Sequence, residues 1–257
     1  MIFIVGGKGF IGSALVRHAN KHNLEYEIIQ KENKNNFFGK SCDTLIFANG
    51  NSLKYKANKN HFFDFNASVV SVVEYVHKID FKQFVFLSTV DVYDKKNSEL
   101  TTFEKYAINA NSLETYGFHK LLAENYVKKY CKNYIIFRLG GLVGKNLKKN
   151  PVFDFINPEK NVMISGDSKL NFINTDFVAN TIFKITNKKI NNETFNLASK
   201  NSIRLGDIKN IVGFDSEFTP DSSQHIQNYK INTEKIQKYI DLSTSESAIK
   251  EYFNSLS

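Results

Sequence analysis

The sequence predicts an α/β protein built around a mainly parallel sheet. Short apolar runs alternate with amphipathic stretches along the first half of the chain, which is typical of consecutive βαβ units. The first apolar run, Ile2–Val5, leads directly into a glycine-rich turn. The 257 residues suit one α/β body with a modest extension. Their ordinary apolar and charged content excludes a disordered, collagen-like or solenoid chain.

Apolar runs bounded by turns predict five strands, at residues 2–5, 26–29, 44–48, 84–88 and 134–139. Apolar residues at steps of three and four predict helices over 61–78 and 111–130. After Gly144 the alternation decays. There we expect a short strand at 162–164, a helix beginning near Thr175 whose segment returns to the main sheet by residue 198, and helices at 205–211 and 233–239.

The formal charge of +8 suits nucleic acid, a membrane surface or a phosphorylated small molecule, because each presents negative charge. The lysines are scattered beside asparagines, with no aromatic-interleaved RNA motif and no zinc-ligand spacing. We therefore expect a solvated basic surface, no nucleic-acid partner and no metal site.

The sequence indicates neither a signal peptide nor a membrane-spanning helix. Met1–Val5 runs into the glycine turn without room for a signal peptide, and no apolar run approaches the roughly 18 residues of a membrane helix. Cys42 and Cys131 suit a reduced compartment. We expect a cytoplasmic protein without a membrane partner.

The turn Gly6-Gly7-Lys8-Gly9-Phe10-Ile11-Gly12 follows an apolar strand and opens a helix. Glycine permits the tight turn and lets backbone approach a pyrophosphate, while the helix N-terminus offers free N–H groups. This context predicts a Rossmann doubly wound parallel sheet that binds NAD(P). The expected cofactor contacts in the turn are Gly6, Gly9, Phe10, Ile11 and Gly12.

The end of the second strand reads Ile29-Gln30-Lys31, where an acidic residue usually takes the ribose hydroxyls of NAD. Gln30 and Lys31 are therefore the expected cofactor contacts at this place. Lys31 or Lys34 facing a 2′-phosphate favours NADP slightly, whereas Glu32 lies close enough to keep NAD open.

Tyr116 and Lys120 stand four residues apart, on one face of an expected helix. A nearby positive charge lowers a phenol's pKa from about 10, so this spacing predicts a tyrosine that serves as a general base. Thr89 ends the fourth expected strand, at the sheet edge where open α/β sheets present ligands. Its hydroxyl, or that of Ser88, is expected to bind the same substrate oxygen.

These motifs together resemble the extended short-chain dehydrogenase/reductase family, which contains NAD(P)-dependent sugar-nucleotide epimerases, dehydratases and ketoreductases. The resemblance covers most of the chain. It is carried by 6–12, 43–50, Asn66, Ser88-Thr89 before Val92-Tyr93, Tyr-Gly-Phe-His-Lys-Leu-Leu-Ala-Glu from Tyr116, 138–144, 171–178 and Phe195-Asn196-Leu197.

The resemblance implies a role for each matching residue. Thr89 would be the catalytic hydroxyl, Tyr116 the acid/base, and Lys120 the ligand of the nicotinamide ribose. Ala48 and Asn49 would line the cofactor. His119 occupies a position often held by serine, and we interpret it as a packing or surface residue rather than a second base.

Two departures bear on the substrate. Val90-Asp91 stands where the family's 4,6-dehydratases usually have Asp-Glu, and valine donates no proton, so dehydration is disfavoured. Leu170 stands where many members have an arginine that holds a nucleotide diphosphate. The resemblance still favours a nucleotide-sugar 4-ketoreductase or epimerase of surface-glycan biosynthesis. The alternatives are a reductase of another small carbonyl compound and a non-catalytic Rossmann protein that senses cofactor or binds RNA.

The same reasoning divides the chain into two parts. Residues 1–144 and 175–199 are expected to form the NAD(P)-binding Rossmann domain, and 145–174 with 200–257 a small C-terminal substrate-binding region. The resemblance also implies a homodimer through the helices at 61–78 and 111–130.

Overall fold

The computed structural model describes residues 1–51, 53–157, 160–188, 190–213 and 218–256, in two compact units. Unit 1 comprises Met1–Asp94, Ala107–Leu139 and Ala179–Phe195. Unit 2 comprises Lys95–Tyr106, Gly140–Val178 and Asn196–Ser257. The division differs from the expected one chiefly at 95–106, which groups with the C-terminal part of the chain.

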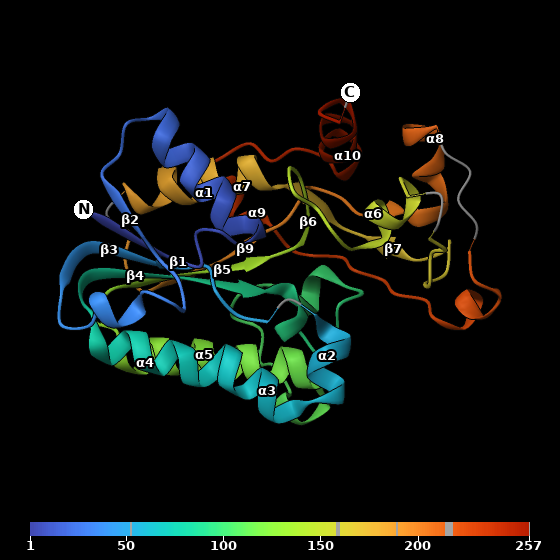
Figure 1. Cartoon of the computed structure of the whole chain (residues 1–257). Coiled ribbons are helices and arrows are strands. Elements are labelled where there is room, and N and C mark those ends of the chain that lie inside the picture. The colour runs from blue at the N-terminus through green and yellow to red at the C-terminus, as the bar shows by residue number, and fades with distance from the viewer. Residues whose placement is uncertain (52, 158–159, 189, 214–217, 257) are drawn as a thin grey trace. The chain divides into compact units, whose positions relative to one another are not determined.

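A six-stranded sheet in the order β2-β1-β3-β4-β5-β9 forms the centre of unit 1 (Figure 1). Its strands are β1 Ile2–Val5, β2 Tyr26–Ile29, β3 Ser41–Phe47, β4 Asp80–Thr89, β5 Tyr134–Leu139 and β9 Glu193–Leu197, the last two residues of which belong to unit 2. The pairs from β2 through β5 are parallel, with Ile4 opposite Ile28 on one side and Ile46 on the other. This confirms the predicted Rossmann-like α/β class.

Helices cover both faces of this sheet (Figure 1). α1 Phe10–Lys21 lies on one face beside the unit 1 part of α7 Thr175–Thr186, and His18 stacks on Phe183 between them at 4.6 Å. α4 Ser71–Lys78 and α5 Thr115–Tyr130 lie on the other face. Buried aromatic residues such as Phe47 and Phe86 fill the space under α4 and α5.

The predicted elements of unit 1 differ from the observed ones mainly at their ends. β2 and β5 have the expected bounds, whereas β3 and β4 begin earlier because their polar first residues still pair across the sheet. The helix expected over 61–78 is α3 His61–Phe65, a π-helical turn η2 Asn66–Val70, and α4. The helix expected from 111 begins at Thr115, since Glu114 is extended with ψ 156°. The short helix α2 Lys54–Lys59 was not expected.

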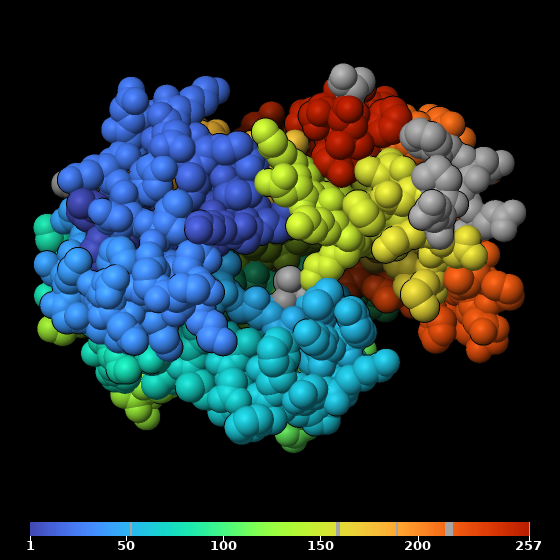
Figure 2. Space-filling model, viewed as in Figure 1, coloured from blue at the N-terminus to red at the C-terminus, as the bar shows by residue number. Residues whose placement is uncertain are grey.

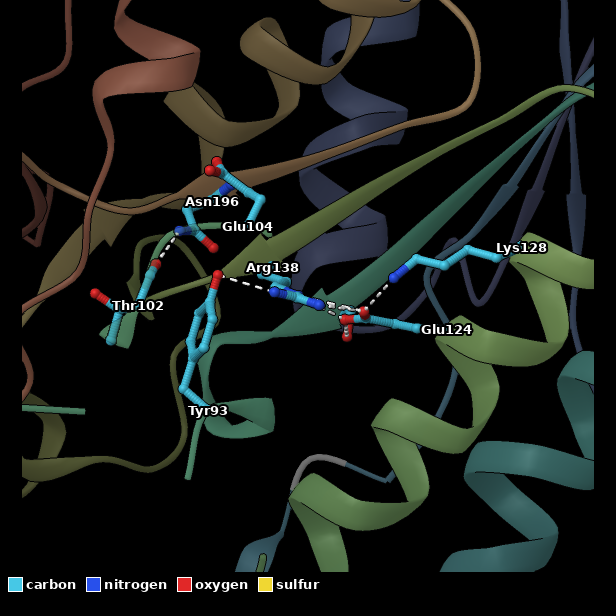
Figure 3. Close-up of polar contacts among 8 residues, drawn as sticks. Tyr93, Thr102, Glu104, Glu124, Lys128, Arg138 and Asn196 are labelled. Carbon is cyan, nitrogen blue, oxygen red and sulfur yellow. Dashed lines mark hydrogen bonds and ion pairs between the residues drawn. The ribbon is translucent and has the colours of Figure 1, made fainter. Parts of the chain in front are cut away.

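Unit 2 contains short elements joined by long polar connections. They are β6 Gly141–Val143, α6 Pro151–Phe155, β7 Lys169–Leu170, β8 Phe172–Asn174, β10 Ile203–Arg204, α8 Lys209–Val212, α9 Glu234–Gln237 and α10 Ser245–Asn254. Asn196 holds 95–106 in this unit: its amide nitrogen donates to the Thr102 carbonyl at 2.6 Å, and its backbone N–H donates to Glu104 at 2.8 Å (Figure 3).

Three expectations in this region need correction. The strand expected at 162–164 is wrong, because Val162 forms only an isolated bridge, with Phe218. In place of the helix expected at 205–211, the structure has a 3₁₀ turn at Leu205–Asp207 and then α8, which ends one residue later than expected, and in place of the helix at 233–239 it has the shorter α9. α10 was not expected. Within the described residues, no helix has the length and apolar character needed to cross a membrane.

Candidate active site

The turn between β1 and α1 has the backbone geometry that its glycine spacing predicts. Gly6 takes a φ of +79°, a left-handed conformation that favours glycine. A Cβ on Gly12 would lie 2.0 Å from the Gly6 carbonyl oxygen, so α1 starts this close to β1 only with glycine there. Gly9 is exposed, and among the described residues a Cβ there would meet only the Gly6 oxygen, at 3.1 Å. The space over Gly9 is open to a ligand.

α1 presents an uncapped N-terminus at this open space. Gly9 is the N-cap residue, and α1 begins with Phe10, Ile11 and Gly12. As far as the structure describes the chain, no side chain caps this terminus and no acidic residue lies in its first turn. Uncapped amides and the positive end of the helix dipole attract an anion, so the turn fits the pyrophosphate of a dinucleotide.

Gln30 lies beneath the same turn. With its amide oriented to satisfy both partners, its side-chain oxygen accepts hydrogen bonds from the Gly7 and Lys8 amides, each at 3.0 Å. Its backbone N–H donates to Asn33 Oδ1 at 2.7 Å. Gln30 therefore stabilises the glycine turn from the end of β2. The sequence did not predict this structural role.

The two lysines considered for a 2′-phosphate differ in their surroundings. Lys34 Nζ lies 2.5 Å from Glu74 Oε2 on α4. Burial acts to raise the pKa of Glu74, but hydrogen bonds and charge from Lys34 and Lys78 outweigh it and hold that pKa below its ordinary value. Lys31 is exposed. Of the pair, Lys31 is therefore the better placed to meet a ligand.

The residues after β3 lie against the glycine turn. A Cβ on Gly6 would lie 3.1 Å from the backbone nitrogen and Cα of Asn49 and 3.2 Å from the Ala48 carbonyl carbon. The structure thus brings Ala48 and Asn49 beside the glycine turn, although they follow Gly6 by more than 40 residues in sequence.

Thr89 and Tyr116 come together at the carboxyl end of β4. A Cβ on Gly117 would lie 2.2 Å from the Asp91 carbonyl oxygen, so the start of α5 packs directly on the 3₁₀ turn η3 Val90–Val92. This close packing brings the Tyr116 phenol close enough to Thr89 for the hydroxyl to act on its pKa. Thr89 Oγ1 also accepts from the Asp91 N–H at 3.1 Å, as the N-cap of η3.

The pKa of the Tyr116 phenol is raised above its ordinary value. Burial is the largest cause, and the charges of Asp91 and Asp64 add to it, while the Thr89 hydrogen bond acts to lower it. The four-residue spacing to Lys120 predicted the opposite direction. That expectation is wrong for this structure, because desolvation and two carboxylates raise the pKa more than Thr89 lowers it. The phenol is protonated at neutral pH.

The Lys120 ammonium is buried between β4 and the glycine loop after β3. Its Nζ donates to the Leu87 carbonyl at 3.2 Å and lies 5.1 Å from the centre of the Phe86 ring. A Cβ on Gly50 would lie 3.3 Å from Nζ. Burial lowers the pKa of Lys120 to about 8, although buried carboxylates such as Asp64 act to raise it. Part of the Lys120 population is neutral just above physiological pH.

The rival hydroxyl, Ser88, has another partner. Ser88 Oγ donates to Glu124 Oε1 at 2.6 Å, and Arg138, 2% exposed, donates to Glu124 Oε2 at 2.7 Å. Figure 3 shows Arg138 between Glu124 and Tyr93, whose hydroxyl accepts at 2.9 Å, with Lys128 at the outer side of Glu124. The side chain of Ser88 is thus held in a buried network, and Thr89 is the hydroxyl beside Tyr116.

A second buried carboxylate, that of Asp64, acts on the pKa of both Tyr116 and Lys120. His119 Nδ1 lies 2.7 Å from Asp64 Oδ2, and Asn51 and Ser68 donate to Asp64 Oδ1 at 2.9 and 3.3 Å. The His119 ring also packs edge-on to Phe65 at 5.4 Å. The interpretation of His119 as a packing residue missed this polar contact, because a helical histidine gives no local signal of a partner 55 residues away.

An ion pair beside Thr89 was also missed. Lys54 Nζ on α2 lies 2.6 Å from Asp91 Oδ2, and Thr89 Oγ1 donates to the same carboxylate oxygen at 3.2 Å. The Asp91 side chain is 11% exposed and that of Lys54 is 42% exposed. The sequence offered no signal for Lys54, since α2 itself was not expected.

In unit 2, Leu170 is buried at 8% exposure and pairs with Ile203 across β7 and β10. Its neighbour Lys169 lines a cleft of about 560 Å³ together with Arg204 and Asp207. Arg204 is already paired there, 2.7 Å from Asp167 and 3.4 Å from Asp207. Leu170 is a core residue of unit 2, and the cleft contains none of the three expected catalytic residues.

The chain is similar to known proteins over most of its length. The model of the NAD dependent epimerase/dehydratase family matches residues 2–198. A protein of Methanocaldococcus jannaschii named a putative UDP-glucose 4-epimerase is 24% identical over 292 aligned residues, which cover 96% of this chain and 92% of that one.

Two solved structures share the fold over nearly their whole length. A UDP-glucose 4-epimerase of Thermotoga maritima with UDP-glucose is 17% identical at a TM-score of 0.79, covering 99% of both chains. A dTDP-4-dehydrorhamnose reductase of Bacillus anthracis with NADP is 14% identical at a TM-score of 0.81, covering 99% of this chain and 97% of that one. At these identities the likeness shows the fold alone.

Proposed function

The chain belongs to the NAD dependent epimerase/dehydratase family and is an enzyme of the extended short-chain dehydrogenase/reductase type, and from this premise we propose that it reduces or epimerises a nucleotide sugar at a ring carbon. The observation that carries the proposal is the meeting of Thr89 and Tyr116 at the end of β4, with Lys120 one helical turn further along α5. The 24%-identical relative named a putative UDP-glucose 4-epimerase supports a nucleotide-sugar substrate.

Each residue has one part in this reaction. Bound NAD(P) supplies the hydride donor and acceptor. The Thr89 hydroxyl holds the reacting substrate oxygen, and the Tyr116 phenol donates a proton to it or takes one from it. The Lys120 ammonium holds the nicotinamide ribose hydroxyls. The glycine turn and the start of α1 hold the pyrophosphate, and Ala48 and Asn49 line the cofactor.

The raised pKa of Tyr116 suits reduction of a carbonyl group better than epimerisation of an alcohol. A protonated phenol is ready to donate as hydride arrives at a carbonyl carbon, which is the 4-ketoreductase direction. An epimerase needs the phenolate first, to take a proton from an alcohol. We therefore propose ketoreduction as the first candidate reaction and epimerisation as the second. We also propose that the reaction belongs to surface-glycan synthesis in the cytoplasm.

A panel of 4-keto and ordinary nucleotide sugars tests this function. Incubation with NADPH or NADH, followed by cofactor absorbance and product NMR, separates the outcomes. Consumption of reduced cofactor with a 4-keto sugar indicates ketoreductase activity, and isomerisation without net consumption indicates epimerase activity. Turnover of a carbonyl compound that carries no nucleotide, with the panel inert, would replace the nucleotide-sugar proposal.

For the cofactor, we propose a modest preference for NADP, supported by exposed Lys31 after β2. Lys31→Ala should weaken NADPH binding more than NADH binding, because only NADPH carries the 2′-phosphate. Lys21→Ala, an exposed lysine at the end of α1, is the matched control. Equal losses for both cofactors would remove the preference.

For assembly, we propose a homodimer through α3, η2, α4 and α5. The supporting observation is apolar exposure on α3 and η2, where Phe62 is 77%, Phe65 37% and Val70 44% exposed. Figure 2 shows this segment, in cyan, on the visible surface. Exposed phenylalanine at this density is typical of an interaction surface. Light scattering of Phe62→Glu against the unaltered protein tests the dimer.

A further inference from the structure

Four side chains form a continuous polar path beside the proposed catalytic oxygen site. The start of α5 packs on η3, which places the Tyr116 phenol beside the Thr89 hydroxyl. Thr89 Oγ1 donates to Asp91 Oδ2 at 3.2 Å, and the same oxygen lies 2.6 Å from Lys54 Nζ. Tyr116 is half-buried and Thr89 is 7% exposed, while the side chains of Asp91 and Lys54 are 11% and 42% exposed. The path therefore leads from the site to solvent.

Building on the proposed function, we propose that Asp91 and Lys54 form a proton relay that reprotonates Tyr116 after it has given its proton to the substrate oxygen. The three links are hydrogen bonds or a short ion pair between groups that exchange protons readily. Lys54 comes from α2, Asp91 from η3 and Tyr116 from α5. The relay thus depends on three elements meeting at the end of β4.

The proton balance closes without a further reactant. When the substrate oxygen takes the phenol proton, an O–H bond forms on the substrate and the Tyr116 O–H bond breaks. The Thr89 hydroxyl, which donates to Asp91 at rest, then gives its proton to the Tyr116 phenolate. Thr89 is reprotonated through the Asp91 carboxyl, which takes its proton from the Lys54 ammonium. Solvent returns one proton to Lys54, so every relay group ends as it began.

The carboxylate has a second consequence for the phenol. Asp91 and Asp64 face Tyr116 with negative charge, and Lys54 compensates the charge of Asp91. Like charge nearby disfavours the phenolate, so the path holds Tyr116 in the protonated, donating form between turnovers. The Thr89 cap of η3 uses only the backbone N–H of Asp91, so capping does not require the Asp91 carboxylate to pair with Lys54.

Ionisation of Tyr116 in the substrate-free enzyme tests the path independently of any activity. The difference between the ultraviolet titrations of each protein with and without Tyr116→Phe isolates the Tyr116 phenol. Asp91→Asn should lower its pKa, because a negative charge is removed, and Lys54→Met should raise it. Asp80→Asn, an exposed carboxyl at the start of β4, is the matched control and should leave it unchanged. Equal values in all variants would overturn the proposal.

Kinetics on the substrate found for the enzyme test proton transfer itself. Asp91→Asn should lower kcat about a hundredfold, the lower end for a positioned acid/base, with cofactor affinity unchanged. Added formate should restore activity to Asp91→Ala in a concentration-dependent way, but not to Tyr116→Phe. Full kcat in Asp91→Asn, or loss without rescue, would mean that Asp91 only positions Thr89. Inactivity of the unaltered enzyme on the whole panel would instead contradict the proposed function, and the titration would still show whether Asp91 and Lys54 act on the Tyr116 phenol.

Discussion

At the residue scale, a substitution at Gly9 tests cofactor binding with little effect on folding. A side chain there meets only the Gly6 oxygen among the described residues, but it would fill the space expected for a pyrophosphate. Gly9→Val should therefore lower the free energy of unfolding by only about 1 kcal/mol, the usual cost of a poor N-cap residue, and abolish NAD(P)H binding. Calorimetric titration of the folded variant checks this. Unaltered affinity would remove the glycine turn from the site.

Lys120 gives cofactor binding a pH dependence. Burial lowers the pKa of its ammonium to about 8, so the charged, donating form is lost as the pH rises through that value. NADPH affinity should fall over this range in fluorescence titrations. Lys120→Arg, whose guanidinium stays protonated, should flatten the profile even if it weakens binding. The same decline in Lys120→Arg would assign the pH effect to another group.

Among single residues, those that belong to a motif could be predicted from the sequence. Thr89, Tyr116 and Lys120 stood out by position, and the structure brings Thr89 and Tyr116 together while Ser88 joins the Glu124 network. The partners Asp64 and Lys54 were missed. Both contacts join segments more than 30 residues apart, and no local periodicity indicates which buried carboxylate a distant side chain will meet.

At the element scale, α5 sets the distance between Tyr116 and Thr89. Its first turn lies so close to η3 that a methyl group on Gly117 would overlap the Asp91 carbonyl. Gly117→Ala should push α5 outward, lower the free energy of unfolding by about 1–3 kcal/mol and reduce kcat. Asn125→Ala, exposed on the same helix, is the control. Denaturant melts and steady-state rates check both effects, and unchanged rates would show that this spacing is not critical.

The elements that sequence reasoning predicted well have strong local signals. β2 and β5 are apolar runs bounded by turns, and both have the expected bounds. α2 and α10 were missed because the first is short and lysine-rich and the second has only a modest apolar stripe. The π-helical turn η2 was also missed, since one extra residue per turn hardly changes a pattern of three- and four-residue steps.

At the scale of the whole molecule, a buried ion pair ties α5 to the sheet of unit 1. Arg138 on β5 donates to Glu124 on α5, and Ser88 on β4 donates to the same carboxylate. Burial acts to raise the pKa of Glu124, but Arg138 outweighs it and holds that pKa below its ordinary value. The pair's contribution to stability is therefore present above the ordinary pKa of a glutamate and is lost as the pH falls through the lowered value.

Removing one partner of this pair should be costly. Arg138→Met leaves a buried charge without its counter-ion and should lower the free energy of unfolding by about 3–5 kcal/mol at neutral pH. The double variant Arg138→Met with Glu124→Leu should recover part of that loss. Arg204→Met, whose ion pair in unit 2 is exposed, is the control and should leave the free energy of unfolding nearly unchanged. Equal losses for the two arginines would contradict this account.

The chemistry of the whole enzyme rests on Tyr116, and its replacement by phenylalanine tests that claim most directly. The change removes one hydroxyl from a side chain whose phenol is held by Thr89. Tyr116→Phe should keep the fold and the NAD(P)H affinity, while kcat on the nucleotide sugar turned over by the unaltered enzyme falls at least about a hundredfold. Retention of full kcat in the folded, cofactor-binding variant would contradict the assignment of Tyr116 as the acid/base.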